Sequence, residues 1–381
     1  MDVLGPRSRL ALLLDHFATV PDWRQPWKVA YPLREVMFLV VCGTIADNDD
    51  YENIAAWGEA HLPFLRRFSP FHHGIPCADW LGVIMNRVGP DLFTTCFSAW
   101  VAECWPNKPT LVAIDGKTSR RSHDHGKGQR ALHLVSAFAT NTRLVLGQEA
   151  VDEKSNEITA IPALLERIDL AGALVSIDAM GCNPTVAKAI TGAQADYLLA
   201  VKANQQNLHA EIVRYFETAP AAELDTAETL GKDHGRIETR RHRVSRKVDW
   251  ISSERAYPDA PRFDNLASLA TVETTIECKG KVKTERRYYI SSRALTAQDF
   301  ATAVRSHWAI ENSLHWTLDV TFREDLSRLR AGHGAKNMAV VRHFAFNLIR
   351  QIDDKKSLKT RRKAASWDPN YPLRVMQAPT R

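Results

Sequence analysis

The sequence has no closely spaced pair of cysteines and no long apolar segment, and both absences exclude classes of protein. Its six cysteines are scattered, without a Cys-x-x-Cys pair or a Cys/His spacing that would hold zinc. We therefore expect reduced thiols in the core. The longest apolar stretch, residues 36–42, is far shorter than the roughly 20 residues of a membrane-spanning helix, so no membrane span is expected.

The first residues also lack the pattern of a signal peptide. The apolar run at residues 10–14 is too short for a signal-peptide core and is followed at once by Asp15 and His16. The sequence therefore predicts a cytoplasmic protein without a membrane partner.

A uniform charge excess is missing, although the formal net charge of the 381 residues is +6. Residues 323–381 carry 14 Lys and Arg against 5 Asp and Glu, which is +9, and the preceding residues sum to −3. Residues 1–105 are acidic, with 8 basic and 12 acidic side chains. A basic excess confined to a few places indicates a protein that meets a polyanion locally.

The hydrophobic periodicity divides the chain into a helical part and a mixed part. Residues 1–105 have apolar positions at helical spacing, and Asp49 or Asp50 is a candidate N-cap for the helix through Ile54. Pro106 and Pro109 then punctuate the chain, and we place a boundary near residue 107.

Strands and helices alternate after this boundary, which indicates an α/β sheet. Strand-like runs lie at residues 110–114, 131–139, 143–150, 173–177 and 196–201, and helical spacing lies at residues 157–168 and 184–191. Between about 220 and 295 the alternation stops, and a β-rich insertion is indicated by residues 244–251, 267–277 and 286–292. Helical stretches follow at residues 297–318 and 336–351, and then a charged tail.

Two of the buried-looking strands end in an acid that is followed closely by glycine. Asp115 precedes Gly116, and Asp178 lies three residues before Gly181. Sites in open α/β sheets assemble at strand ends, and glycine lets a ligand approach the backbone closely. Either acid alone could equally start a turn or cap the next helix, so one strand-end acid does not establish a site.

A helical segment farther along the chain supplies a third acid. His307, Glu311 and His315 recur at every fourth residue and form an ionisable stripe. A solvated helix face with an internal ion pair is the plain alternative. Trp308 and Trp316 in the same turns instead indicate burial, and a buried Glu311 needs a partner.

Two Asp and one Glu brought together would form an oxygen-ligand site suited to Mg²⁺, with Mn²⁺ as a substitute. Two such ions ~4 Å apart can activate a nucleophile and stabilise the leaving oxygen of a phosphodiester. Their charge also keeps clustered carboxylates ionised.

Seven motifs follow one another over nearly the whole chain. They are Ala113-Ile-Asp115-Gly-Lys117, His133-Leu-Val-Ser-Ala-Phe-Ala139, Ser155-Asn-Glu-Ile-Thr-Ala-Ile-Pro162, Ile177-Asp-Ala-Met-Gly-Cys182, Asp196-Tyr-Leu-Leu-Ala-Val-Lys202, His234-Gly-Arg-Ile-Glu-Thr-Arg240 and His307-Trp-Ala-Ile-Glu-Asn-Ser-Leu-His-Trp-Thr-Leu-Asp319. In this order they closely resemble the motifs of the ISAs-type, or H-repeat-associated, insertion-sequence transposases. The strings Leu12-Leu-Leu-Asp-His-Phe17 and Pro21-Asp-Trp-Arg24 are similar to that family's helical associated domain.

The resemblance implies an α/β fold, with an RNase H-like catalytic domain that carries a β-rich insertion and follows an all-helical N-terminal domain. Carried over by motif, the catalytic and metal-binding triad is Asp115, Asp178 and Glu311, the same acids that the pattern singles out. We expect the helical domain at residues 1–106, the catalytic domain at 107–350 and a basic tail at 351–381.

The activity that this resemblance implies is that of a bacterial DNA transposase. Such an enzyme cuts the ends of an insertion sequence and joins them to target DNA by two-metal phosphodiester hydrolysis and transesterification. Its expected partner is double-stranded DNA, bound by a homo-oligomer that we expect to be a dimer. A metal-dependent nuclease without strand transfer, and a DNA-binding protein whose catalysis has lapsed, remain as alternatives.

One part of a wider transposase pattern is missing here. Related transposases often carry Tyr, Arg and Lys around the Glu, where this chain has Val304, His307 and Leu318. We therefore expect local substitutes for the phosphate contacts, namely Arg305, His307, Asn312 and His315.

Basic clusters beside the acids are expected to follow a phosphate backbone, although a charge run is more often only a solvated face. The expected DNA-binding residues are Lys117, Arg120, Arg121, Lys202, Arg236, Arg240, Arg241, Arg305, His307 and Asn312. Asp319 could serve as a fourth acid, but a pair with Arg323 one turn on is its simpler role.

Overall fold

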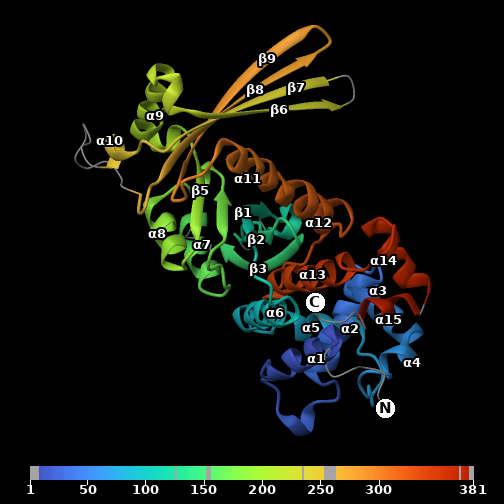
Figure 1. The fold of residues 1–381 in the computed structure, drawn as a ribbon. Coiled ribbons are helices and arrows are strands. Elements are labelled where there is room, and N and C mark those ends of the chain that lie inside the picture. The colour runs from blue at the N-terminus through green and yellow to red at the C-terminus, as the bar shows by residue number, and fades with distance from the viewer. Residues whose placement is uncertain are drawn as a thin grey trace.

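The computed structural model describes residues 8–124, 126, 128–151, 156–233, 236–252, 263–368 and 370–376. Within them, a helical body lies beside one long mixed sheet (Figure 1). Residues 155, 234 and 235, which belong to two of the motifs above, lie outside this described part. The expected α/β class, with a helical region before the sheet, is confirmed.

Five strands form the half of the sheet that carries the strand-end acids. They are β1 (Leu111–Thr118), β2 (His133–Ala139), β3 (Leu144–Val151), β4 (Leu174–Ile177) and β5 (Asp196–Val201). Their order is β3-β2-β1-β4-β5, in which β1, β2 and β3 pair antiparallel while β4 and β5 run parallel to β1. The carboxyl ends of β1 and β4 therefore lie side by side.

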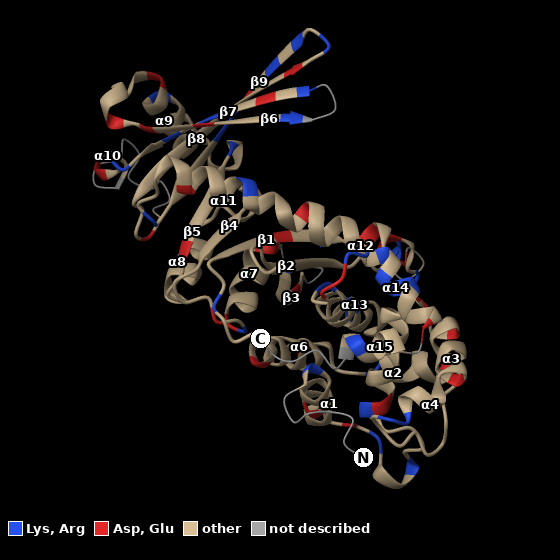
Figure 2. Ribbon diagram, turned by 45° about the vertical axis from the view of Figure 1, so that its right-hand side comes forward, with Lys and Arg blue, Asp and Glu red and all other residues tan. Residues whose placement is uncertain are grey.

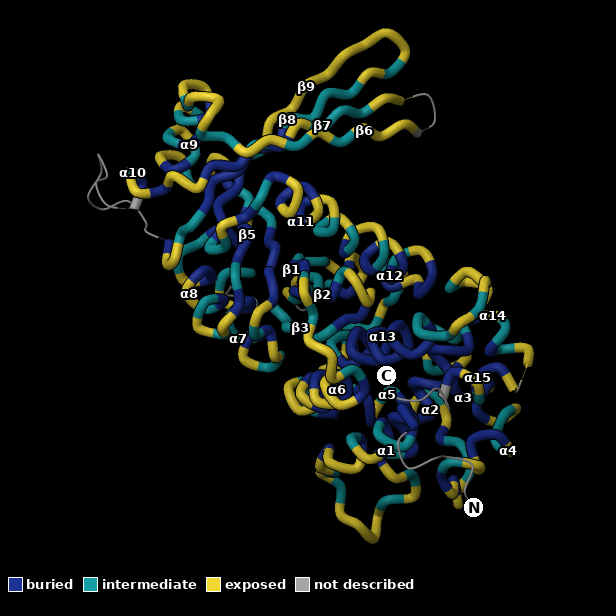
Figure 3. Tube along the Cα trace, in the orientation of Figure 1, coloured by how far each residue is buried: buried dark blue, intermediate teal, exposed yellow. Residues whose placement is uncertain are grey.

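The insertion extends this same sheet. Its strands are β6 (Asp225–Asp233), β7 (Arg236–Ser245), β8 (Ser268–Cys278) and β9 (Lys281–Ser291). They pair antiparallel in the order β9-β8-β7-β6, and β9 joins β5. We call these four strands the arm, because their outer halves project beyond the helices and are largely exposed (Figure 3).

The prediction of a strand at residues 244–251 is wrong in its second half. Strand β7 ends at Ser245, and α10 (Asp249–Ser252) follows. Val248 and Ile251 are three residues apart, and both are buried in the core beneath the sheet. A helical turn brings such a pair to one side, whereas a strand would point them to opposite faces.

Helices cover both faces of the sheet at the acid-bearing strands. One face packs against α7 (Glu157–Leu165), α8 (Pro184–Gly192) and α9 (Gln206–Thr218). On the other face lies α11 (Ala297–Ala309), which shares a core with residues of β7, β8 and β9. The sheet is thus enclosed where the acids lie, and the arm is not.

The N-terminal region is helical, as expected. Its helices are α1 (Arg9–Thr19), α2 (Leu33–Ile45), α3 (Tyr51–Ala60), α4 (Leu62–Leu65), α5 (Ala78–Met85) and α6 (Pro90–Cys104). Asp50 is the N-cap of α3, where its side chain accepts a hydrogen bond from the backbone of Asn53 at 2.8 Å. Among the described residues, no helix is both long and apolar enough to cross a membrane.

A long buried helix, α13 (Gly334–Arg350), connects this region to the sheet. Its apolar residues belong to the same core as those of α2 and α6, and this core also includes Val145 on β3. Figure 3 shows α13 almost wholly buried. A helix assigned by sequence to the catalytic domain therefore also builds the core of the helical domain.

The basic tail expected at residues 351–381 is corrected in its described part. It contains two helices, α14 (Leu358–Trp367) and α15 (Asn370–Met376), which pack on α13 and α2. Ala365, Tyr371 and Val375 are buried in the helical core. The buried side of α14 carries two charged residues, Arg361 and Arg362, next to Ala365. Contacts of this side attach the C-terminal segment to the helical body.

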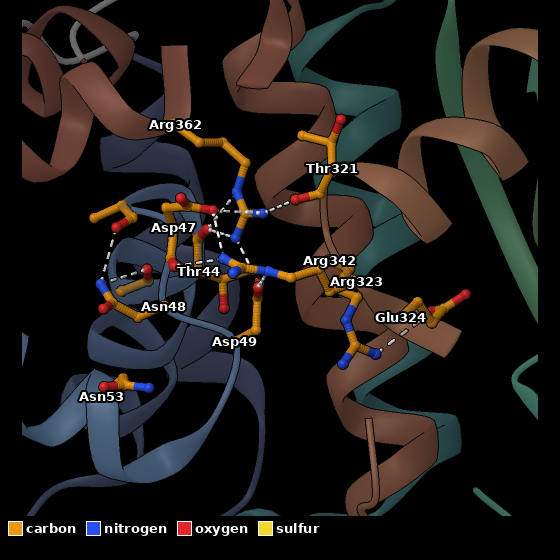
Figure 4. Close-up of polar contacts among 12 residues, drawn as sticks. Thr44, Asp47, Asn48, Asp49, Asn53, Thr321, Arg323, Glu324, Arg342 and Arg362 are labelled. Carbon is orange, nitrogen blue, oxygen red and sulfur yellow. Dashed lines mark hydrogen bonds and ion pairs between the residues drawn. The ribbon is translucent and has the colours of Figure 1, made fainter. Parts of the chain in front are cut away.

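Arg362 lies at the centre of a polar cluster that we call the arginine clamp (Figure 4). Its side chain is fully buried, and its guanidinium donates hydrogen bonds to the carbonyl of Thr44 at 2.8 Å and to Asp49 at 2.6 Å. It also donates to the carbonyl of Thr321 and lies 3.1 Å from Asp47.

The clamp joins three segments that are distant in sequence. Thr44 lies in α2, Asp47 and Asp49 lie in the loop before α3, and Thr321 is the C-cap of α12 (Trp316–Val320). Arg323 contacts the same two acids, at 2.9 Å from Asp47 and 2.7 Å from Asp49, so it does not form the expected pair with Asp319. A buried guanidinium needs all of these partners, because an unpaired charge in the core is costly.

We predict that Arg362→Met lowers the free energy of unfolding by about 3 kcal/mol, because the carbonyls of Thr44 and Thr321 lose their buried donor and Asp47 and Asp49 keep only the more exposed Arg323. Arg323→Met is the matched control. Its side chain is 48% exposed, so its loss is expected to cost less than about 1 kcal/mol. Urea denaturation of both variants measures their free energies of unfolding. An equal loss of stability in the two variants would contradict the claim that the buried position of Arg362 makes its contacts more important than those of Arg323.

Candidate active site

Two of the predicted acids meet because their strands run in register. Strands β1 and β4 are parallel, and Ile114 is the partner of Ile177. Asp115 and Asp178 are the next residues on each strand, and neighbouring strands lie about 4.8 Å apart. Asp178 also starts the short turn η4 (Ala179–Gly181), where its carboxylate accepts a hydrogen bond from the backbone of Met180 at 2.9 Å.

The third acid reaches the same place through a break in helical regularity. The helix expected at residues 297–318 is continuous in path, but α11 and α12 are separated by a π-helical turn, η7 (Ile310–His315). Glu311 and His315 both lie in this turn. Turns of this kind are rare and occur frequently at functional sites.

The three predicted acids line one cavity of about 210 Å³. It opens between β4, β5, β9 and α11, and Asp115, Asp178 and Glu311 form one part of its wall. The polar and charged residues on the remaining wall are Ser176, Lys202, Arg287, Tyr289, Trp308 and His307.

A histidine completes a compact group of donors beside this cavity. One oxygen each from Asp115 and Glu311 and one ring nitrogen of His315 all lie within 4.8 Å of one another. His315 Nδ1 is 3.5 Å from the Asp115 carboxylate and 3.5 Å from the Glu311 carboxylate. Sequence reasoning placed His315 among the substitutes for phosphate contacts. Its four-residue spacing from Glu311 was visible, but its proximity to Asp115 was not.

Crowding of like charges perturbs the titration of this group. Burial, together with the neighbouring carboxylates of Glu311 and Asp178, raises the pKa of Asp115 to about 8. The hydrogen bond with His315 lowers the pKa of Glu311. Asp115 therefore binds a proton more tightly than Glu311 does, as expected for two coupled carboxylates in different surroundings.

Lys117, which we predicted to contact DNA, is occupied by other partners. Its ammonium lies 2.7 Å from Asp319 and 2.8 Å from Glu324, and its side chain is only 10% exposed. This prediction is therefore corrected: Lys117 neutralises acids at the far end of the helix that carries Glu311. Asp319 is likewise paired with Lys117 and not with Arg323.

His307, which we predicted as a substitute phosphate contact and a DNA-binding residue, lies on the cavity wall. Its Nδ1 lies 3.0 Å from the hydroxyl of Ser176, and burial lowers the pKa of its imidazole. It therefore lines the cavity as a neutral ring. At the other two positions of the missing pattern, Val304 and Leu318 are buried apolar residues, so neither has room for a phosphate contact.

The other predicted DNA-binding residues lie in three places: at or near the cavity in sequence, on the turn η2, and on the arm. Lys202, Arg305 and Asn312 are exposed, and Lys202 lines the cavity, while Arg305 and Asn312 adjoin the lining residues Val304 and Glu311 in sequence. Arg120 and Arg121 are exposed on the turn η2 (Arg120–Ser122), where Arg120 lies 3.2 Å from Asp325. The arm residues have acidic neighbours. Arg240 is 3.0 Å from Glu238, Arg236 is 3.5 Å from the same acid, and Arg241 is 3.5 Å from Glu228.

Two family models match the chain. The model described as transposase DDE domain matches residues 106–348, and the model described as DDE_Tnp_1-associated matches residues 14–101. Among curated relatives, "H repeat-associated putative transposase YhhI" of Escherichia coli (strain K12) is 37% identical over 377 residues, which is 96% of this chain and 98% of that protein.

"Putative transposase YncI" of Escherichia coli O157:H7 is 39% identical over 364 residues, 94% of this chain and 93% of that protein. A solved structure titled "Cryo-EM structure of piggyBac transposase synaptic complex with hairpin DNA" is similar at a TM-score of 0.42 and 10% identity. It covers 98% of this chain and 80% of that one, and it is too distant to support an argument.

We predict that Asp115→Asn stabilises the metal-free protein at alkaline pH. Because the folded-state pKa of Asp115 is raised to about 8, the folded protein binds more protons than the unfolded chain between the ordinary pKa and about pH 8. Stability from this group therefore falls as pH rises through that window. In EDTA, the variant is expected to melt above the wild type at pH 8, and the gap should shrink toward pH 5.

Thermal unfolding at both pH values measures this gap. Glu217→Gln, an exposed carboxylate on α9, is the matched control and should leave the melting temperature unchanged at both pH values. A gap for Asp115→Asn that widens toward acid would contradict the assigned direction.

Proposed function

The chain belongs to the transposase DDE domain family and is an insertion-sequence transposase, and we propose that Asp115, Asp178 and Glu311 are its catalytic residues. The observation that supports this assignment is that the three carboxylates line one cavity, although 133 residues separate Asp178 from Glu311 in sequence. They reach it from β1, from the end of β4 and from the π turn η7.

The donor set fits a hard divalent cation, and a divalent metal is typical of this family. Carboxylate oxygens from Asp115 and Glu311 converge, and burial together with the neighbouring carboxylates raises the pKa of Asp115. When bound, Mg²⁺ or Mn²⁺ would activate the attacking oxygen and stabilise the leaving oxygen of a phosphodiester. Imidazole is a poor ligand for Mg²⁺, so we assign His315, whose Nδ1 lies 3.5 Å from the Glu311 carboxylate, to a place beside the metal ligands and not among them.

The chain's own residues would bind and orient the DNA strand at this cavity. Lys202 and Arg287 line the wall opposite the acids and supply the positive charge that a phosphate requires. His307 is fixed by its contact with the hydroxyl of Ser176, and burial lowers the pKa of its ring on the same cavity wall. The reaction is strand cleavage at the element's end, followed by in-line attack of the freed 3′-OH on target DNA.

The arm offers a continuation of this surface for duplex DNA, and strand alternation identifies which side. His242 on β7 and Tyr289 on β9 both contact Phe300 of α11, so they lie on one face of the arm. Residues at alternate positions share that face. They include Arg236 and Arg240 on β7, and Lys281, Lys283 and Arg287 on β9.

Arg241 and Lys232 alternate onto the opposite face of the arm, away from Phe300. Figure 2 shows basic and acidic residues following one another along the arm, which is why net charge alone does not identify the DNA-facing side. The proposed path therefore keeps Arg236 and Arg240 from the predicted set and leaves out Arg241. A DNA-bound homodimer remains a prediction.

We predict that Asp178→Asn lowers strand cleavage of DNA carrying the element's end by at least about 100-fold in Mg²⁺, because loss of a ligand exceeds the loss of an outer contact to a metal site. Glu217→Gln is expected to cleave as the wild type does. Fluorescence anisotropy should show that both variants still bind the same DNA. Wild-type cleavage by Asp178→Asn would overturn the assignment, and cleavage without a joined product would indicate a nuclease without strand transfer.

We further predict that Lys281→Glu/Lys283→Glu weakens DNA binding and reduces the slope of log affinity against log salt by about 2, because each lost phosphate contact removes roughly 0.9. Lys232→Glu/Arg241→Glu makes the same charge change on the opposite face and should change that slope much less. Anisotropy titrations from low to moderate salt give both slopes. A larger change in the opposite-face variant would contradict the proposed path.

A further inference from the structure

A hydrogen-bonded chain of three side chains lies on the face of β1 opposite to the acids. The hydroxyl of Thr118 is 2.7 Å from His133 Nδ1, and His133 Nε2 is 2.7 Å from Glu157 Oε1. Thr118 and His133 are direct cross-strand partners on β1 and β2, and Glu157 is the first residue of α7. The chain thus ties three elements together. His133 and Glu157 belong to two motifs that the proposed reaction leaves without a role.

The polarity of this chain follows from its acceptor. A carboxylate only accepts hydrogen bonds, so His133 Nε2 carries the hydrogen that it donates to Glu157. In the neutral ring, Nδ1 then accepts from the hydroxyl of Thr118. Both ring nitrogens are satisfied, which fixes the orientation of the imidazole. The His133 side chain is 29% exposed and that of Glu157 is 17% exposed, so the pair is partly buried.

The pair lies directly over the backbone that follows Asp115. A Cβ placed on Gly116 would lie 2.1 Å from Glu157 Oε1 and 2.6 Å from His133 Nε2. Adjacent strand residues point to opposite faces, so the pair packs behind the peptide whose other face presents Asp115. The absence of a side chain at Gly116 is therefore what allows the pair to contact this strand end.

The same helix also supports the second acid-bearing strand. A Cβ on Gly181, just after Asp178, would lie 2.4 Å from Ile177 and 3.2 Å from Ile161 of α7. Helix α7 thus packs closely behind both strand ends, and Glu157 is its contact with the first of them. A carboxylate at a helix N-terminus is also favoured by the helix dipole.

We propose that His133 and Glu157 are positioning residues, which hold the end of β1 so that Asp115 can share a cation with Glu311. The proposal rests on the function proposed above, since it assumes a divalent cation at Asp115. Neither residue touches the acids, and their effect is transmitted through the backbone of Gly116. Carboxylate crowding favours movement of Asp115 away from Glu311, and the pair behind the strand opposes that movement.

Manganese binding tests this proposal without relying on catalysis. The full-length protein is titrated with Mn²⁺, and the free ion is followed by its electron paramagnetic resonance signal. Glu157→Ala is expected to weaken Mn²⁺ binding by about 10-fold, in the range found for outer contacts of metal sites. Glu157→Gln should retain most of the affinity, because the amide oxygen still accepts from His133 Nε2. Gly116→Ala should resemble Glu157→Ala, because its methyl group displaces the pair.

Two further measurements separate positioning from general destabilisation. The melting temperature of Glu157→Gln should match that of the wild type, and the cleavage rate of Glu157→Ala should recover at high Mn²⁺. Should Glu157→Ala fail to fold, Thr118→Val takes its place. Thr118 is exposed, and loss of its hydroxyl removes one of the two hydrogen bonds that orient the ring of His133, so Mn²⁺ binding should weaken by about 3-fold.

The outcomes distinguish this proposal from the proposed function. Wild-type Mn²⁺ affinity in Glu157→Ala, or in its substitute Thr118→Val, combined with loss of binding in Asp115→Asn, overturns the positioning role alone. Wild-type Mn²⁺ affinity in Asp115→Asn overturns the metal site itself. A Glu157→Gln variant as weak as Glu157→Ala would show that the negative charge matters and the hydrogen bond does not, which also contradicts the proposal.

Discussion

Repulsion among three carboxylates in a half-enclosed cavity is the constraint on which the rest of this structure depends. Asp115, Asp178 and Glu311 line the same cavity, and the pKa of Asp115 rises to about 8 because burial and its neighbours disfavour its charge. Three carboxylates this close together bind a cation or share a proton. Without either, they move apart unless the backbone keeps them in place. The surrounding elements supply that restraint from several sides, so the folded state keeps the three carboxylates close together despite their repulsion.

The restraints act on each acid through a different element. Strand register places Asp115 beside Asp178, and the π turn places Glu311 across from them. Lys117 faces the same side of β1 as Asp115 and binds Asp319 and Glu324, so β1 is tied to the helix beyond Glu311. The arginine clamp then fixes the end of α12 to the N-terminal helices. The N-terminal helices are thereby coupled mechanically to the position of Glu311.

The sequence was informative where the signal is local. An apolar run that ends in an acid marked Asp115 and Asp178, and spacing in one helix marked Glu311. It was uninformative where a residue's partner lies far away in sequence. Lys117 and Glu324 are 207 residues apart, so the sequence did not show that this lysine is a buried counterion and not a phosphate contact. The basic C-terminal segment misled for the same reason, because Arg362 is bound by carbonyls and acids of α2, the following loop and α12. The π turn at Ile310–His315 could not be predicted, because the spacing of apolar residues there fits an ordinary α-helix.

Anomalous diffraction from crystals soaked in Mn²⁺ tests the central claim most directly, because it locates the cation without requiring DNA or turnover. The account predicts an anomalous peak bounded by the carboxylates of Asp115 and Glu311, on the cavity side that Asp178 also lines. The same soak of Asp115→Asn crystals should lose that peak. An empty carboxylate cluster beside a peak elsewhere, or a peak unchanged in Asp115→Asn, would contradict the view that these crowded acids form the metal site of the transposase.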